Sequence, residues 1–88
     1  MTQADRIRQF VARNYIAPAR ARGERAATIR AGDVHRDMGL KSAMSAVCSA
    51  LRTAALQKLT GAVLVRREGP ENGANVFFAF SLAASLPN

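Results

Sequence analysis

The side chains that most often carry out catalytic chemistry are scarce in this sequence. His35 is the one histidine and Cys48 the one cysteine, and neither belongs to a metal-binding spacing. No glycine-rich phosphate loop, catalytic carboxylate pair or nucleophile–base motif is visible. A lone histidine on a short helix is most often a capping or surface residue, and Cys48 falls on an apolar stripe typical of a core. The sequence therefore predicts a protein that is not an enzyme and needs no metal, cofactor or small-molecule substrate.

Arginine is the functional side chain that the sequence supplies in quantity. Thirteen lysines and arginines face six acidic residues, for a net charge of +7, and eleven of the thirteen are arginine. Residues 1–30 carry a net +5, residues 31–60 a net +2, and residues 61–88 are balanced. Basic side chains bind polyanions because they release the counterions condensed on phosphates. Ribosome association, an anionic membrane surface or a GC-rich genome would give the same bias, so charge alone does not identify the partner.

Length and composition indicate one globular domain. The chain has 88 residues, 49% of them hydrophobic and 22% charged, which is enough for one modest core that dimerisation would extend. A single cysteine excludes an intramolecular disulfide and favours a reducing compartment. We see no signal peptide and no apolar run long enough to span a bilayer. The expectation is a soluble cytoplasmic protein, with a homodimer as its natural assembly.

The apolar spacing predicts two helices and a short strand in the first half of the chain. A helix is expected over residues 3–17, with Thr2 as N-cap and Asp5 completing a capping box. Pro18 disturbs this helix, which could continue for a turn or two until Gly23. A short strand over 27–30 and a short helix over 31–39 follow, and Gly39 ends that helix in a left-handed turn.

A third helix is predicted to begin after Lys41, with Ser42 as its N-cap, and to end at Gly61. Its apolar stripe consists of Met44, Val47, Cys48, Leu51 and Ala55, extended by Leu59. Two strands, 62–67 and 75–82, then form a hairpin around a loop that contains Asn72-Gly73. Alternation in the second strand predicts a buried face made of Val76, Phe78, Phe80 and Leu82, with Phe77 on the opposite face.

This order of helix, short strand, helix, helix and hairpin resembles the winged helix, a variant of the helix-turn-helix DNA-binding domains. The resemblance covers about residues 3–82 and leaves 83–88 as a tail. It implies an α+β fold with three helices, a short strand and a C-terminal hairpin, or wing. The sequence departs from a tight helix-turn-helix at His35, where an alanine is usual, and in the apolar positions after Gly39.

The resemblance implies a DNA-binding function, either in transcriptional regulation or as a low-specificity, nucleoid-associated factor. The third helix would enter the major groove of double-stranded DNA, and the wing would touch the flanking backbone or minor groove. Small hydroxyl residues permit close approach, and Arg52 is the one long side chain placed to read a base. The candidate DNA contacts are Arg30, Lys41, Ser42, Ser45, Ser49, Arg52, Thr53, Arg66, Arg67 and Asn72.

Two other functions fit the same residues. A winged-helix adaptor would bind a protein through the Ser/Ala helix face and Phe77, and its charge would be incidental. An RNA-binding role is the third alternative. One continuous basic face on the folded chain would favour DNA, whereas basic residues scattered over the whole surface would favour the adaptor.

Overall fold

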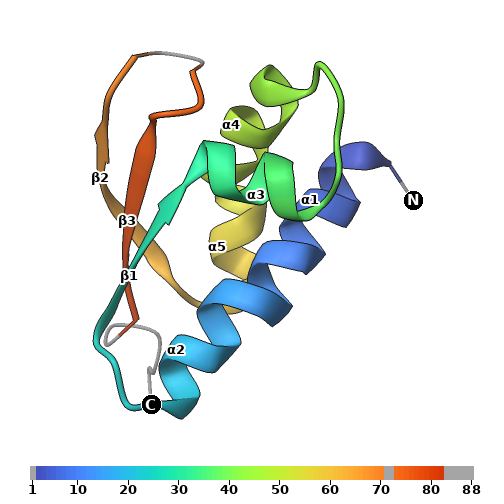
Figure 1. Cartoon of the computed structure of the whole chain (residues 1–88). Helices are drawn as coiled ribbons and strands as arrows, with labels where there is room; N and C mark the ends of the chain where they lie inside the picture. Colours follow the sequence, from blue (N-terminus) through green and yellow to red (C-terminus); the bar gives the residue numbers. More distant parts are fainter. Residues whose placement is uncertain (1, 71–72, 83–88) are drawn as a thin grey trace.

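The computed structural model describes residues 2–70 and 73–82, and it has an α+β fold. Helices lie on one side of the molecule and a sheet on the other (Figure 1). The elements, in chain order, are α1 (Gln3–Val11), a π-helical segment (Ala12–Ile16), α2 (Ala17–Ala21), β1 (Ala26–Arg30), α3 (Ala31–Asp37), α4 (Met44–Arg52), α5 (Ala54–Thr60), β2 (Val63–Glu68) and β3 (Phe77–Ser81). In the described part of the chain, no helix combines the length and hydropathy needed to cross a membrane.

The N-terminal helical stretch takes the longer of the two courses that the sequence allows, past Pro18 toward Gly23. It begins as expected, because the Thr2 hydroxyl accepts the Asp5 amide at 3.1 Å and the Asp5 carboxylate accepts the Thr2 amide at 3.3 Å. The stretch then continues past Pro18 to Ala21 (Figure 1). Proline removes a backbone donor and crowds the preceding turn, and here it follows the wider π-helical turn at the start of α2. Gly23, at φ +79°, follows the helix in a left-handed conformation.

The described strands form an antiparallel sheet in the order β1-β3-β2. Strand β3 is central, and it pairs Phe78 with Ile29 and Phe80 with Ala27 of β1. The predicted alternation is confirmed, because Val76, Phe78, Phe80 and Leu82 are all buried. Phe77 is 40% exposed on the opposite face.

The core lies between the sheet and the helices. Its largest fully buried side chains come from every layer, and they are Phe78, Phe80, Ile7, Ile16, Ile29, Leu51 and Leu56. Helix α1 packs directly on α4, which in turn contacts α3. Cys48 is buried in this core, as its place on the apolar stripe predicts. The core therefore fixes α4 from two sides and leaves only its outer face free.

The predicted third helix is in fact two helices. Helix α4 ends at Arg52, and Thr53 adopts an extended conformation (φ −85°, ψ 154°) before α5 begins. The predicted stripe is therefore wrong beyond Leu51. Ala55 and Leu59 are exposed, and Leu56 is the residue of α5 that reaches the core.

The start of α4 also differs from the prediction. Ser42 is not the N-cap: it lies at φ +50°, and Ala43 takes the cap position without a side-chain bond. The His35 imidazole Nε2 accepts the Ala43 amide at 3.3 Å, and this contact ties α3 to the first turn of α4. The expected left-handed turn at Gly39 is confirmed at φ +68°. His35 therefore has the capping role that its position on a short helix predicts.

Candidate nucleic-acid interface

The outer face of α4 is small and free of acidic residues. Ser45, Ser49 and Arg52 are exposed along it, and Ser42 is exposed just before it. Thr53 is half-buried, and its hydroxyl donates to the Ala50 carbonyl at 3.2 Å. The available surface is narrow, because Ala46 and Ala50, which border Ser49 on one side of the helix, pack toward the core. Where the exposed side chains are serines, the helix can approach another surface closely.

The β2-β3 hairpin is held against the helices by backbone bonds. The first N–H groups of a helix have no partner within it, and here the hairpin supplies the acceptors. The Ala31 amide donates to the Val76 carbonyl and the Gly32 amide to the Ala74 carbonyl, both at 2.9 Å. The Cys48 sulfur lies 4.0 Å from the Gly73 carbonyl oxygen. The tip of the hairpin and α4 consequently share one end of the molecule (Figure 1).

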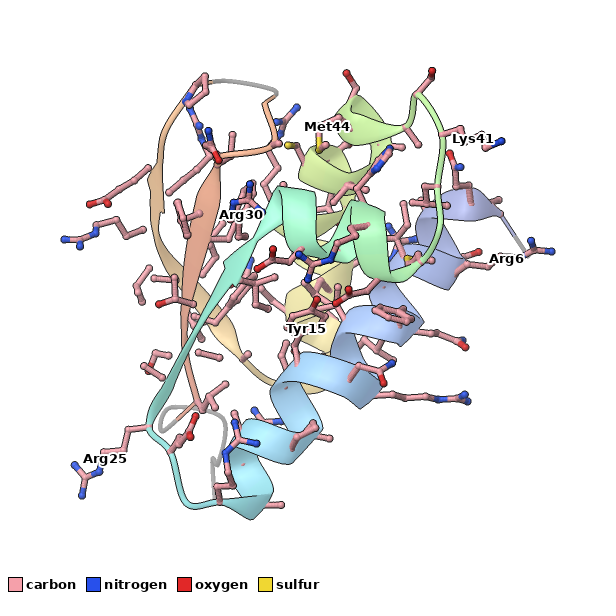
Figure 2. All side chains as sticks on the ribbon, in the orientation of Figure 1. Arg6, Tyr15, Arg25, Arg30, Lys41 and Met44 are labelled. Atoms are coloured by element: carbon pink, nitrogen blue, oxygen red, sulfur yellow. The ribbon has the colours of Figure 1, made fainter. Side chains whose placement is uncertain are left out.

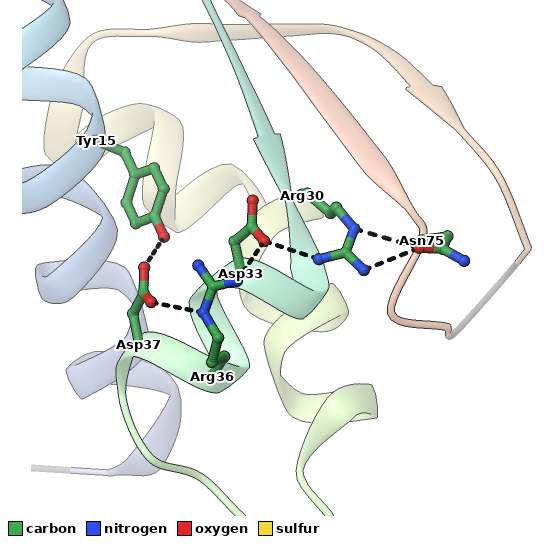
Figure 3. Close-up of polar contacts among 6 residues, drawn as sticks. All are labelled: Tyr15, Arg30, Asp33, Arg36, Asp37 and Asn75. Atoms are coloured by element: carbon green, nitrogen blue, oxygen red, sulfur yellow. Dashed lines mark hydrogen bonds and ion pairs between the residues drawn. The ribbon is translucent and has the colours of Figure 1, made fainter.

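Arg30 reinforces this attachment instead of projecting into solvent. Its Nε and Nη2 atoms donate to the Asn75 side-chain oxygen at 3.2 and 2.9 Å, and Nη1 lies 2.7 Å from the Asp33 carboxylate (Figure 3). The side chain is therefore engaged on both sides, at the junction of β1, α3 and the hairpin. Arg30, one of the predicted phosphate contacts, is thus engaged by other side chains of the fold. Its role here is to position the hairpin.

The same cluster extends to the N-terminal helical stretch. Asp33 also pairs with Arg36 at 3.4 Å, Arg36 pairs with Asp37 at 3.0 Å, and the Tyr15 hydroxyl donates to Asp37 at 2.8 Å (Figure 3). Burial and this hydrogen bond raise the pKa of Tyr15 to about 12. The bond from Tyr15 and the pairing with Arg36 lower the pKa of Asp37. The cluster joins the N-terminal helical stretch, β1, α3 and the hairpin through charged and polar contacts at the surface.

Ion pairing leaves much of the positive charge uncompensated. Every carboxylate within residues 2–70 and 73–82 lies in an ion pair, and these pairs are Asp5–Arg8, Glu24–Arg22, Asp33–Arg30, Asp33–Arg36, Asp37–Arg36 and Glu68–Arg66. The basic residues without such a carboxylate are Arg6, Arg13, Arg20, Arg25, Lys41, Arg52, Lys58 and Arg67. These eight carry the charge that remains available to a polyanion.

Three of the uncompensated cations border α4. Lys41 precedes the helix, Arg52 is its last residue, and Arg67 lies on β2. Burial raises the pKa of the Cys48 thiol, and the charges of Arg52 and Arg67 oppose that rise. Arg52 lies one helical turn after Cys48 in α4, and Arg67 lies on β2 opposite Phe78. The fold brings together residues that are far apart in the sequence.

The two hairpin arginines have different surroundings. Arg66 pairs with Glu68 at 2.9 Å, and its side chain is 69% exposed. Arg67 donates to the carbonyls of Gly69 and Pro70 at 3.3 and 3.4 Å, so it is positioned while its charge stays unpaired. Asn72, the remaining predicted contact, lies outside the described residues. Arg67 is the stronger candidate of the pair for a phosphate contact.

Positive charge is not confined to the α4 end of the molecule. Lys41 and Met44 mark that end, and Arg6 lies on the same side as Lys41 (Figure 2). Arg25 projects from the opposite end, near the start of β1. The basic residues are therefore not all gathered at one end of the molecule.

Comparison with protein-family models, with curated proteins and with solved structures finds no match. Within the described residues, no group of three or more histidine, cysteine, aspartate or glutamate side chains could hold a metal ion. Sequence reasoning missed two features that shape the site, the Gly32–Ala74 contact and the Arg30–Asn75 bond. The glycine in the first turn of α3 was a usable signal for the former, because a backbone can approach a glycine closely.

Proposed function

We propose that this chain is a winged-helix DNA-binding module. The order of elements supports this fold, since the strand before α3 joins the C-terminal hairpin in one sheet and α4 lies beside the hairpin tip. On this proposal α4 enters the major groove, whose width admits a helix, and the hairpin contacts the flanking backbone. A homodimer would lengthen the contacted site.

One observation carries the proposal: an exposed helix face without acidic residues is bordered by three cations that have no carboxylate partner among the described residues. Ser45 and Ser49 let the helix approach the duplex and can donate to phosphate or base-edge acceptors. Arg52 is the base-reading residue, and a bidentate contact with guanine contributes about 1–3 kcal/mol of discrimination. Lys41 and Arg67 contact phosphates on either side.

These separate roles, with two cations on phosphates and one arginine on a base, predict binding dominated by contacts with the DNA backbone and a modest sequence preference. Serine hydroxyls accept several partners, so Ser45 and Ser49 discriminate weakly between bases, and Arg52 supplies most of the preference. A low-specificity, nucleoid-associated factor or a transcriptional regulator with a short site would bind DNA in this way.

Salt dependence of duplex binding tests the proposal directly. With Lys41, Arg52 and Arg67 each neutralising one phosphate, the log–log slope of affinity against salt is expected to be about −3. Arg67→Gln should reduce its magnitude by about one and weaken all sequences alike, whereas Arg52→Gln should also relax sequence preference. Arg25→Gln, at the far end of the molecule, is the matched control.

Two outcomes of this experiment would reject the proposal. The first is no measurable duplex binding at low salt. The second is an equal loss of affinity in Arg25→Gln and Arg67→Gln, which would indicate attraction to net charge alone. Preference for a structured RNA over the duplex in direct competition would instead favour the RNA-binding alternative.

A protein-binding adaptor is the second candidate, and one observation favours it. The outer side of the sheet exposes Phe77, Val63 and Val65, with Val65 61% exposed at a register shift in β2. Exposed apolar side chains grouped on one face are typical of protein contacts. If Phe77→Ala abolishes association with a partner protein while duplex binding is absent, the adaptor is the better description.

A further inference from the structure

Arg20 has a buried donor without a partner. It extends from α2 toward the end of α5, where its Nη1 atom donates to the Thr60 carbonyl. The second terminal nitrogen, Nη2, is buried and makes no hydrogen bond within residues 2–70 and 73–82. Buried polar groups nearly always have a partner, and an unpaired donor on a charged group is costly. Within the described residues, this guanidinium group therefore uses only part of its hydrogen-bonding capacity.

A small cavity adjoins this arginine. Its volume is about 200 Å³, and it is lined by Ala12, Ile16, Ala17, Arg20, Leu59 and Thr60. Two of these residues belong to the π-helical segment, a kind of turn that is frequent at functional sites. Leu59 lines one side of the cavity and is itself 53% exposed, so few neighbouring side chains pack against it. The cavity is apolar apart from the guanidinium group and Thr60.

The charge of Arg20 has no carboxylate to balance it. Within the described residues, every carboxylate is engaged in an ion pair with another arginine. An arginine in an apolar surrounding attracts a carboxylate strongly, because the charge-assisted hydrogen bond forms in a medium of low dielectric constant. The occupant that fits must bring both a negative charge and an apolar body.

We propose that this cavity binds a small aliphatic monocarboxylate. Its carboxylate accepts hydrogen bonds from the Arg20 guanidinium, and its tail packs on Ala12, Ile16 and Leu59. A cavity of about 200 Å³ has room for a short aliphatic chain. Inorganic phosphate fits poorly, because apolar walls cannot satisfy its other oxygens. The site is independent of duplex binding.

Titration of the whole chain followed by ¹H–¹⁵N NMR tests the proposal. Acetate, butyrate and inorganic phosphate are compared at constant ionic strength. We expect saturable shifts with butyrate at the amides of Ile16, Leu59 and Thr60 and at the Arg20 side chain. Butyrate should bind about tenfold more tightly than acetate, because it buries two additional methylene groups. Phosphate should cause only small, unsaturable shifts.

Variants separate the cavity from general anion binding. Arg20→Gln should abolish the saturable shifts, and Arg25→Gln should leave them unchanged. Ala17→Leu fills the cavity from an exposed helical position with a good helix former, so it should block butyrate while preserving the fold. This second variant decides the matter if Arg20→Gln does not fold. Equal affinity for the three anions, or undiminished butyrate binding in folded Ala17→Leu, would overturn the proposal.

Discussion

Substitution of Gly32 by alanine tests how the hairpin is docked. A Cβ atom at this position would lie 2.8 Å from the Ala74 carbonyl oxygen and 3.0 Å from the Ala74 Cβ. The nearest atom belongs to the backbone, so a rotamer change cannot relieve the contact. The hairpin must move away from α3, and the backbone bonds that join Gly32 to Ala74 and Ala31 to Val76 are the first to lengthen.

The size of the effect follows from these contacts. Loss of two backbone hydrogen bonds costs about 1 kcal/mol each. The new Cβ also lies 2.9 Å from Arg30 Nη1, so the bond from Arg30 to Asp33 is disturbed as well. Alanine is the better helix former, and this offsets up to about 1 kcal/mol in α3. We expect a net destabilisation of about 1–2 kcal/mol, or about 5–15 °C in Tm for a domain of this size.

Thermal unfolding by circular dichroism measures the change, and Gly23→Ala is the control. Gly23 lies at φ +79° with no atom within 4 Å of an added Cβ, so alanine there introduces backbone strain without a clash. Only Gly32→Ala should shift the amide resonances of residues 74–76 and weaken duplex binding. A Gly32→Ala protein as stable as the parent, with unshifted hairpin resonances, would refute the docking described above.

Three further predictions concern the hydroxyl of Tyr15, the thiol of Cys48 and the core residue Phe78. Tyr15 has a pKa raised to about 12, so its contribution to stability is complete below pH 10 and is lost as pH rises toward 12. Tyr15→Phe should therefore flatten the alkaline fall of Tm, and equal slopes in both proteins would contradict this. Burial raises the pKa of Cys48, so Ellman's reagent should react slowly with the native protein and rapidly in denaturant; a fast native reaction would show that the thiol is accessible. Phe78→Ala should cost about 3–5 kcal/mol in urea unfolding, far more than Phe77→Ala on the exposed face, and similar costs would contradict the assigned faces.

The sheet could be predicted from the sequence because its signal is local. Val76, Phe78 and Phe80 recur at every second position, which is the spacing that a strand with one buried face requires. Glycines marked the ends of the helices for the same reason, because a left-handed backbone conformation favours glycine at that position whatever the rest of the fold. The α+β class and the order of elements follow from such local rules.

The break at Thr53 could not be predicted, because periodicity fits both outcomes. A continuous helix would place Ala55 and Leu59 below Leu51, whereas the extended Thr53 turns the next helix so that Leu56 faces the core. Threonine is only slightly unfavourable in a helix, so its identity does not reveal a break. Packing of the whole domain selects between the two.

In the candidate interface, too, local features could be predicted from the sequence and long-range contacts could not. Exposure of Ser45 and Ser49 followed from the apolar stripe of a single helix. The engagement of Arg30 did not, because its partner Asn75 is 45 residues away in sequence. Charge counting treats all arginines alike, although the fold holds Arg30 between two side chains and leaves Arg52 free.

Rigid attachment of the hairpin bears on whether three cations are sufficient for DNA binding. Binding loses free energy when side chains and loops must be ordered on contact. Here the hairpin is already held by the two amides of α3 and by Arg30, and Arg67 is held by the carbonyls of Gly69 and Pro70. The cation on the hairpin is thus presented at a fixed position beside α4, so its contact with a phosphate requires little further ordering. By this reasoning Asn75→Ala, which removes the acceptor of Arg30 without changing any charge, should weaken duplex binding and leave the salt slope unchanged. A lowered slope in that variant would instead mean that the hairpin's position sets how many phosphates are neutralised.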